Sequence, residues 1–321
     1  MRCFMVGLLL LITVPGLVCA DPPVIEDVPL IEWYMIDLPP IQNATGDSRG
    51  LGYTDLMRWR LIARLDGYRH VLRNSNVQRM LSDIKTKPNI CNTAFLKTPE
   101  REAFMAYATP LHAQFPNGAV VLKSRLADEF SRYIEEDVLD VQALIEAGGR
   151  LVVQSGRSYG RALDQVVAEA EERKQLIVIT TNRPVEGKIG LLAAQRAEVA
   201  LLYPYEYFFF LADTVLTDDY EFFQAAGETG YTLNHLACSR SELGEEVVAT
   251  VDPLILRDRD GFFAAAYRKW LPPSMLPRHA DHHLDAFGVP LEAHSSVMPT
   301  AEQAIADCML NGGVWFQGDC R

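Results

Sequence analysis

The regular alternation of strand-like and helix-like segments between residues 30 and 271 most constrains what this chain can fold into. Short apolar runs at residues 30–36, 90–96 and 151–154 are typical of buried strands. Between such runs, apolar residues recur at helical spacing, as in residues 54–66. Strands that alternate with helices predict an α/β fold whose sheets are mostly parallel and flanked by helices.

The other expected elements follow the same pattern, and no internal repeat is visible. Further strands are expected at residues 68–72, 118–123, 177–181, 199–203 and 231–238. Further helices are expected at residues 77–84, 138–147, 158–174, 189–196, 242–256 and 261–271. Residues 272–299 are rich in proline and histidine, and we expect a linker there, followed by a small C-terminal module.

The first twenty residues have the pattern of a secretory signal peptide. Arg2 gives a positive start, an apolar run follows, and the segment ends in the small residue Ala20. We therefore expect residues 1–20 to be cleaved and the chain to be exported to the periplasm or secreted. The apolar run is short for a retained membrane anchor. Lipid attachment at Cys19 is a further alternative, but Val18 is an unsuitable residue before it.

The charge of the chain excludes some classes of partner. Its formal net charge is −12, and loss of Arg2 makes it more negative. Such a chain is not expected to bind nucleic acid or an anionic membrane surface through bulk electrostatics. No second apolar segment is long enough to span a bilayer, so we expect a soluble monomer.

Four cysteines remain after the leader: Cys91, Cys238, Cys308 and Cys320. An even number of cysteines in an oxidising compartment favours disulfides, and no C-x-x-C spacing indicates a metal or redox site. Four cysteines allow three pairings. We expect Cys91 to pair with Cys238 and Cys308 with Cys320, although spacing alone leaves the other pairings open.

The sequence gives no clear sign of a metal or cofactor site. His279, His282 and His283 have the composition of metal ligands, but they lie in the proline-rich segment, where we expect no fixed geometry. No Gly-x4-Gly-Lys phosphate loop occurs. We therefore expect no metal, no cofactor and no catalytic residue.

Arg101 is the first candidate ligand-binding residue. Thr98 is a good N-cap and Pro99 suits the first helical position, so a helix is expected to begin directly after the strand at residues 90–96. Helix starts at the carboxyl ends of parallel strands face the crevice where ligands bind, and their free N–H groups favour anions. An arginine there adds paired donors for a carboxylate, although pairing with Glu100 or Glu102 on a solvated helix end is the simpler interpretation.

The turn after the strand at residues 151–154 repeats this arrangement. Gly156 lets a ligand approach the backbone, Arg157 adds a positive charge, and Ser158 is placed to cap the next helix or to donate its hydroxyl. An ordinary capped helix with an exposed arginine would give the same pattern. Two such sites in two α/β units nevertheless indicate a shared anion site.

The motifs at residues 97–102 (KTPERE), 157–160 (RSYG) and 203–206 (YPYE), with the placement of Cys91 and Cys238, resemble a known family. The chain is similar to periplasmic solute-binding proteins of the amino-acid-binding type, and most similar to an uncharacterised bacterial subgroup with the KTPERE and RSYG motifs.

The resemblance covers about residues 31–271 and implies a type II clamp of two lobes. Lobe 1 would comprise residues 21–116 and 230–271, and lobe 2 residues 117–229. Crossovers near residues 112–117 and 228–231 would form the hinge, and residues 272–321 lie outside the resemblance.

The resemblance also implies roles for individual residues. The arginine that matches Arg101 grips the ligand's carboxylate, and the turn that matches Gly156, Arg157 and Ser158 closes on the same group. In the family, an acid in lobe 2 binds the ligand's ammonium. This sequence departs from that pattern, because Tyr203 stands near the matching position and Glu206 is the nearest acidic candidate. A carboxylate-bearing or otherwise anionic ligand therefore fits better than a plain α-amino acid.

Aromatic residues are further candidates for the walls of the site. Trp33, Tyr34 and Tyr203 could contact a ligand, or they could belong to the core as strand residues do. The hypothesis is an exported binding protein for a small anionic or amino-acid-like ligand, which serves an ABC transporter or a sensor. The alternatives are a cyclohexadienyl-dehydratase-like enzyme on the same fold, with Glu206 as its acid, and a ligand-less envelope interaction protein.

Overall fold

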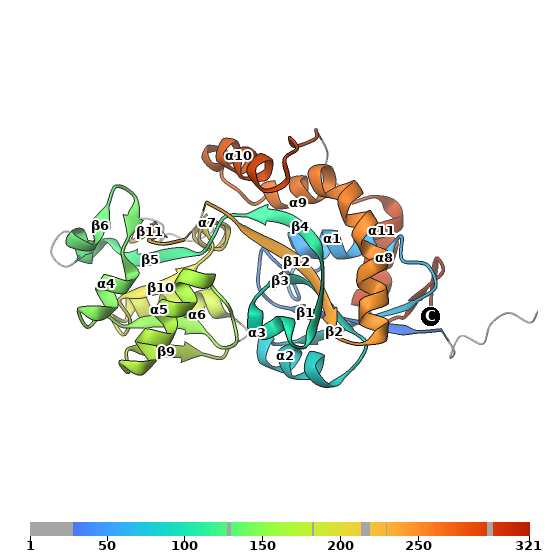
Figure 1. Cartoon of the computed structure of the whole chain (residues 1–321), viewed down its shortest axis with the longest axis horizontal. Helices are drawn as coiled ribbons and strands as arrows, with labels where there is room; N and C mark the ends of the chain where they lie inside the picture. The colour runs from blue at the N-terminus through green and yellow to red at the C-terminus, as the bar shows by residue number, and fades with distance from the viewer. Residues whose placement is uncertain (1–27, 127–129, 182, 213–218, 229, 294–297) are drawn as a thin grey trace, which may run out of the picture.

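The structure is a computed structural model that describes residues 28–126, 130–181, 183–212, 219–228, 230–293 and 298–321. The expected signal peptide at residues 1–20 lies outside the described residues. Two seven-stranded sheets, each flanked by helices, form two bodies side by side (Figure 1). Lobe 1 is the body whose sheet holds the first and the last strand of the described chain. Lobe 2 is the other body.

The sheet of lobe 1 has the strand order β14-β13-β2-β1-β3-β12-β4. Its strands are β1 (Leu30–Ile36), β2 (Arg69–Ser75), β3 (Ile90–Leu96), β4 (Met105–Gln114), β12 (Thr232–Ser239), β13 (Trp315–Phe316) and β14 (Asp319–Cys320). β1 pairs in parallel with β2 and β3, whereas β12 lies antiparallel between β3 and β4.

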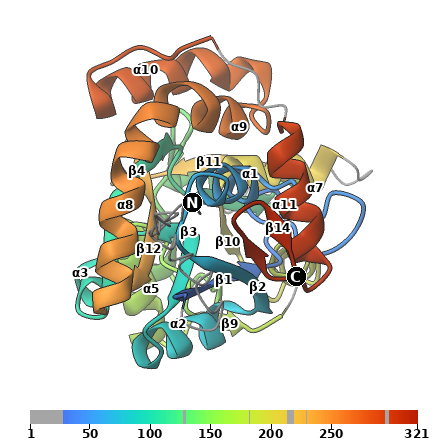
Figure 2. The same cartoon turned by 90° about the vertical axis from the view of Figure 1, so that its right-hand side faces the viewer.

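The helices of lobe 1, apart from the single turn α3, contribute side chains to one continuous core. They are α1 (Tyr53–Ile62), α2 (Val77–Thr86), α3 (Pro99–Glu102), α8 (Glu242–Asp258), α9 (Ala264–Arg268) and α11 (Thr300–Leu310). Figure 2 shows α8, α9 and α11 arranged around α1. α2 begins at the N-cap Asn76 and buries Val77, Met80 and Ile84, whose spacing places them on one helix face.

The sheet of lobe 2 has the order β6-β7-β11-β5-β10-β8-β9. Its strands are β5 (Gly118–Leu122), β6 (Ile134–Glu135), β7 (Val138–Leu139), β8 (Leu151–Gln154), β9 (Leu176–Ile179), β10 (Val199–Leu202) and β11 (Tyr220–Ala225). Its helices are α4 (Val141–Glu146), α5 (Arg161–Glu172), α6 (Pro184–Ala193) and α7 (Pro204–Ala212). The two faces of this sheet carry separate cores, one with Leu163 of α5 and the other with Ile189 of α6.

The chain leaves lobe 1 between β4 and β5 and returns to it between β11 and β12 (Figure 1). The expected α/β class with two helix-flanked sheets is confirmed. Both sheets are mixed rather than mostly parallel, because the strands beside the two crossovers run antiparallel to their neighbours. None of the helices in the described residues is long and apolar enough to cross a membrane.

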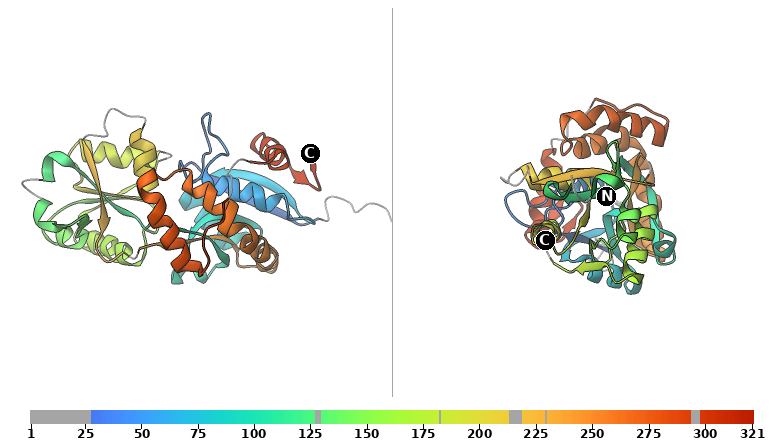
Figure 3. Two further views of the ribbon diagram at one scale, coloured as in Figure 1. Left: turned by 90° about the horizontal axis from the view of Figure 1, so that it is seen from above. Right: turned by 90° about the vertical axis from the view of Figure 1, so that its left-hand side faces the viewer.

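The expected linker at residues 272–299 contains a helix, α10 (Leu276–Phe287), which corrects the sequence interpretation. Pro277 lies in the first turn, where a proline removes no helical hydrogen bond. His279, His282 and His283 are buried against lobe 1 and the crossover instead of lying in a loop. The ring of His282 packs edge-on against Phe115, with centroids 4.9 Å apart. α10 therefore covers the junction of the lobes (Figure 3).

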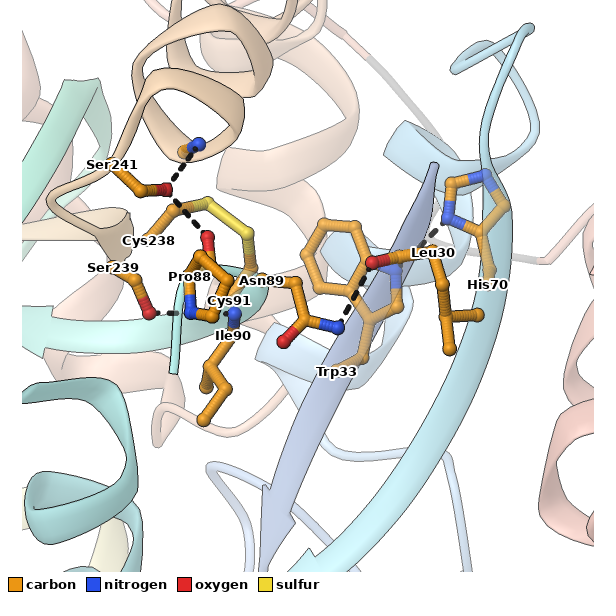
Figure 4. Close-up of a disulfide and its surroundings, with 11 residues drawn as sticks. Leu30, Trp33, His70, Pro88, Asn89, Ile90, Cys91, Cys238, Ser239 and Ser241 are labelled. Carbon is orange, nitrogen blue, oxygen red and sulfur yellow. Dashed lines mark hydrogen bonds between the residues drawn. A yellow bond between two sulfur atoms is a disulfide. The ribbon is translucent and has the colours of Figure 1, made fainter. Parts of the chain in front are cut away.

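Both expected disulfides are present. Cys91 on β3 is bonded to Cys238 on β12, and Cys308 on α11 is bonded to Cys320 on β14. Figure 4 shows the first bond between the two neighbouring strands of the sheet. It therefore joins β3, which precedes the lobe 2 insertion with β4 between them, to β12, the first strand after the insertion.

Candidate functional site

A small cavity of about 70 Å³, partly open to solvent, lies where the two lobes meet. Lobe 1 contributes mainly apolar side chains together with Arg101, and lobe 2 contributes Gly156, Arg157, Ser158 and Tyr203. The described residues that line this cavity include no carboxylate. The structure thus brings both candidate arginines to one cavity, in surroundings that are apolar apart from a few polar groups.

Arg101 reaches the cavity from α3, a single helical turn directly after β3. Thr98 caps this turn, because its hydroxyl oxygen accepts a hydrogen bond from the Arg101 N–H at 3.3 Å. The guanidinium donates to the carbonyl oxygen of Leu96 from Nη1 at 3.2 Å and to that of Gly156 from Nη2 at 3.1 Å. Both acceptors are neutral, and among the described residues no carboxylate forms an ion pair with Arg101. Its positive charge is therefore available to an anion.

The turn at Gly156 contacts lobe 1 directly. Gly156 has a φ of +74°, and a Cβ there would lie 3.0–3.2 Å from atoms of Gln78, Val77 and Leu81 on α2. Ser155 accepts a hydrogen bond from the side-chain amide of Gln78. Glycine suits this position, because a Cβ would press on these α2 side chains and because glycine adopts a positive φ without strain.

The helix after this turn begins at Arg161 rather than at Ser158, so Ser158 is not its cap. The Ser158 hydroxyl and the Tyr159 N–H both donate to the carboxylate of Asp164 in the first turn of α5. This local bonding holds residues 155–160 as a loop. The expected capping role of Ser158 is therefore wrong, although the residue lines the cavity.

Arg157 is already bound by an acid. Its Nη1 and Nη2 donate to Oε1 and Oε2 of Glu206 at 2.8 and 2.7 Å, in a two-bond pair with side chains 8% and 0% exposed. Glu206 also accepts from the Tyr203 N–H at 2.9 Å, at the start of α7. Arg157 was expected to add a positive charge to a shared anion site, but that charge is already balanced, because Glu206 lies 49 residues along the chain and directly beside it in the structure.

The electrostatics of this pair keep both partners charged. Burial by itself would raise the pKa of the Glu206 carboxyl, but Arg157 and Lys188 outweigh it, and the pKa lies below its usual range. The buried Lys188 donates to the carbonyl oxygen of Leu201 at 2.6 Å, and burial, assisted by Arg157, lowers its pKa to about 7. The guanidinium of Arg157 also lies over the Tyr203 ring, 5.0 Å from its centroid.

Two of the expected aromatic residues do not line the cavity. Trp33 is fully buried in the core of lobe 1, where its Nε1 donates to Nδ1 of His70 at 3.1 Å (Figure 4). Tyr34 donates its hydroxyl to Asp83 at 2.6 Å on α2. These residues lie on a central strand, which is buried on both faces, so the expectation that they contact a ligand is corrected.

Comparison of the sequence with family models and with curated proteins found no match. Solved structures do match the fold. A mutant of ArgBP from T. maritima has a TM-score of 0.56 and 17% identity over 76% of this chain and 96% of its own. An amino acid ABC transporter substrate-binding protein from Streptococcus pneumoniae, bound to L-arginine, has a TM-score of 0.55 and 14% identity over 80% and 97%. A histidine kinase sensor domain similar to periplasmic binding proteins has a TM-score of 0.57 and 17% identity over 76% and 96%.

The chain has the type II periplasmic-binding-protein fold. The cavity with Arg101 lies between the lobes of this clamp. TM-scores of 0.55–0.56 establish the shared architecture, but identities of 14–17% do not carry over the chemistry of the site, which must come from this chain's own residues.

Sequence reasoning missed several polar and aromatic residues at this clamp's cavity. Gln42, Gln114, Tyr205 and Asn234 all line it. The Tyr205 hydroxyl lies 3.0 Å from that of Tyr53 on α1, which links the start of α7 to lobe 1. Gln42, Gln114 and Asn234 belong to no motif, and Tyr205 lies in the YPYE segment without a signal of its own, so only the three-dimensional arrangement identifies them.

Proposed function

We propose that this chain is an exported solute-binding protein that captures a small carboxylate-bearing ligand between two hinged lobes. The observation that carries the proposal is the position of Arg101, a cation without an acidic partner among the described residues, at a cavity walled by both lobes. An arginine so placed presents parallel N–H donors to a carboxylate. Captured ligand would then reach a membrane transporter or a sensor, with the protein acting as a monomer outside the cytoplasm.

Clamp motion follows from the way the lobes are joined and touch. We propose lobe boundaries at residues 21–116 and 230–271 for lobe 1 and 117–229 for lobe 2, with the two crossovers as the hinge. Away from the hinge, the Arg101 and Gln78 side chains bond to the turn at residues 155–156 of lobe 2. Contacts that must break when the lobes separate are typical of hinged closure around a ligand.

The structural neighbours support a role in transport or sensing. One is described as an ABC transporter substrate-binding protein bound to L-arginine, and another as a sensor domain of a histidine kinase. Both roles use the same clamp, so the fold supports either. The ligand of this chain is proposed from Arg101 rather than from those relatives.

The geometry favours binding over catalysis. Glu206, the acid that a dehydratase on this fold would need, is fully buried and holds Arg157 with both oxygens. A general acid must reach the proton or leaving group in a plausible substrate pose. Glu206 does not line the cavity, so a binding role accounts for the site better.

Thermal unfolding in the presence of small carboxylates tests the proposal. A ligand that binds only the native state at a hundred times its Kd stabilises the protein by about 2.7 kcal/mol, which raises the Tm by several degrees. The variant Arg101→Met should retain its fold and lose this shift. Arg79→Met is the matched control, because Arg79 lies on α2 with a 73% exposed side chain. If no carboxylate raises the Tm, or Arg101→Met responds like the wild type, the proposal fails.

A further inference from the structure

We propose that Glu206 sets the charge of the ligand: by binding Arg157 it leaves one available cation among the described residues that line the cavity, so the cavity selects a monocarboxylate with a hydroxyl or amide group. This inference rests on the proposed function and adds the chemical class of the ligand. It assigns Glu206 as a specificity-determining residue that acts through Arg157 rather than by touching the ligand.

The first step is the charge balance at the cavity. Arg101 donates only to neutral carbonyl oxygens, whereas Arg157 is bound by both oxygens of Glu206. The described residues lining the cavity include no carboxylate. Among the described lining residues, a second ligand carboxylate would therefore find no unbalanced cation, and a ligand ammonium would find no acid. A charge moved from water into such a site without a partner is strongly disfavoured.

The second step is that a ligand cannot readily take Arg157 from Glu206. The pair has two short hydrogen bonds, and the Tyr203 N–H fixes the carboxylate on its other side. If a ligand displaced Arg157, the fully buried Glu206 would keep its charge without its main partner. Breaking a buried pair by removing one partner is costly because the remaining charge is uncompensated.

The third step concerns the polar groups that remain at the cavity. Gln42 and Asn234 both line it and are 1% and 4% exposed. Gln42 Nε2 and Asn234 Oδ1 have no hydrogen-bond partner among the described residues, and both atoms have almost no exposed surface, so a rotation of each side chain would bring them to a ligand. Buried polar groups are normally paired, and a ligand hydroxyl or amide can both accept and donate. These two side chains therefore complement a neutral polar group on an otherwise apolar ligand.

Calorimetric titration of the full chain, after removal of co-purified solutes, tests this inference. The probes are 2-hydroxy monocarboxylates of three to six carbons, each matched with a 2-hydroxy dicarboxylate and a 2-amino acid of the same length. Titrations at pH 8.5 keep Lys188 largely neutral, since its pKa is about 7. The wild type should bind its best monocarboxylate at least about tenfold more tightly than either matched compound, because an unpartnered charge costs upward of about 1.4 kcal/mol.

Two variants isolate the role of Glu206. Glu206→Gln frees the charge of Arg157 and should raise dicarboxylate affinity relative to the monocarboxylate by about tenfold or more. The double variant Glu206→Gln/Arg157→Gln removes the pair without adding a cation and should keep the wild-type preference. Circular dichroism without ligand establishes that each variant is folded.

The outcomes separate the two proposals. Equal binding of matched mono- and dicarboxylates by the wild type overturns this inference and leaves the proposed function standing, and this measurement needs no variant to fold. Unchanged selectivity in folded Glu206→Gln also overturns it. Failure of every probe to bind any of the three proteins overturns the proposed function and this inference together.

Discussion

The guanidinium Nη2 of Arg101 lies 3.1 Å from the carbonyl oxygen of Gly156, although the two residues belong to different lobes. The residue proposed to hold the ligand's carboxylate thus also holds the lobes together. Because one side chain performs both tasks, ligand binding and lobe closure should be coupled. Substitutions on either side of this contact should therefore affect affinity.

Gly156→Ala should weaken ligand binding about tenfold, because its Cβ would press against Gln78 and Val77 of α2 when the lobes close. Gly148→Ala is the matched control. Gly148 also has a positive φ, +102°, but a Cβ there meets only Gln175 at 3.8 Å. In both variants the positive φ costs a similar amount of folding stability, about 1–2 kcal/mol. A difference in calorimetric affinity between them therefore reports on lobe closure rather than on stability. Equal loss of affinity in the two variants would show that the contact with α2 is irrelevant.

The Arg157–Glu206 pair should be a strongly coupled unit. Each single variant, Arg157→Gln or Glu206→Gln, should lower the free energy of unfolding by about 3–5 kcal/mol, since it leaves an uncompensated buried charge. The double variant should lose much less than the sum of the two. Denaturant unfolding measures the cycle. The exposed pair Arg73–Glu32 should show a coupling below about 1 kcal/mol. Additive losses at Arg157 and Glu206 would contradict the buried geometry.

How far the sequence predicts this structure depends on where the relevant contacts lie along the chain. Leu30–Ile36, Ile90–Leu96 and Leu151–Gln154 form strands with the expected bounds, because each is a short and mainly apolar run. β4 was not expected, since Pro110 interrupts its pattern. In the structure, Pro110 lies where the ladder with β12 is irregular, and a proline without an N–H is tolerated there.

At the candidate site, local features were predictable from the sequence and long-range contacts were not. The local signal of an N-cap and a first-turn proline correctly predicted that a helix with Arg101 begins after β3. The partner of Arg157 was not predictable in this way. Glu206 reaches it only because the ends of β8 and β10 are neighbours in the sheet, and this long-range pairing leaves no local trace in the sequence.

The two disulfides should differ in what they contribute. Cys91 and Cys238 are 147 residues apart, whereas Cys308 and Cys320 are 12 apart. In the chain-entropy description, the longer loop gains more from cross-linking. Paired serine variants should therefore lose about 4–5 kcal/mol for the first bond and about 2–3 kcal/mol for the second, measured by urea unfolding. A larger loss for Cys308–Cys320 would reverse the expected order.

Acid should destabilise the protein partly through His279. Burial lowers the pKa of this histidine to about 3, assisted by Arg268, and its Nε2 lies 3.1 Å from the carbonyl oxygen of Ala113. The unfolded chain binds the proton at about pH 6.5, so stability falls as the pH drops from about 6.5 towards 3. By pH 4 the loss from this residue should be about 3 kcal/mol.

His279→Gln supplies the comparison, because glutamine can still donate to Ala113 but does not titrate. The Tm of this variant should fall less steeply than that of the wild type between pH 7 and pH 4. Parallel Tm profiles for the two proteins would rule out His279 as a source of the acid sensitivity.

The bond between Cys91 and Cys238 has a consequence for proteolysis. All of lobe 2 lies within the covalent ring that this bond closes. A protease that cuts one exposed loop of lobe 2 opens the ring without releasing either piece. The nicked protein should keep its full mass on a non-reducing gel and separate into two fragments only after reduction. Lobe 1 would thus remain covalently joined on both sides of the cut.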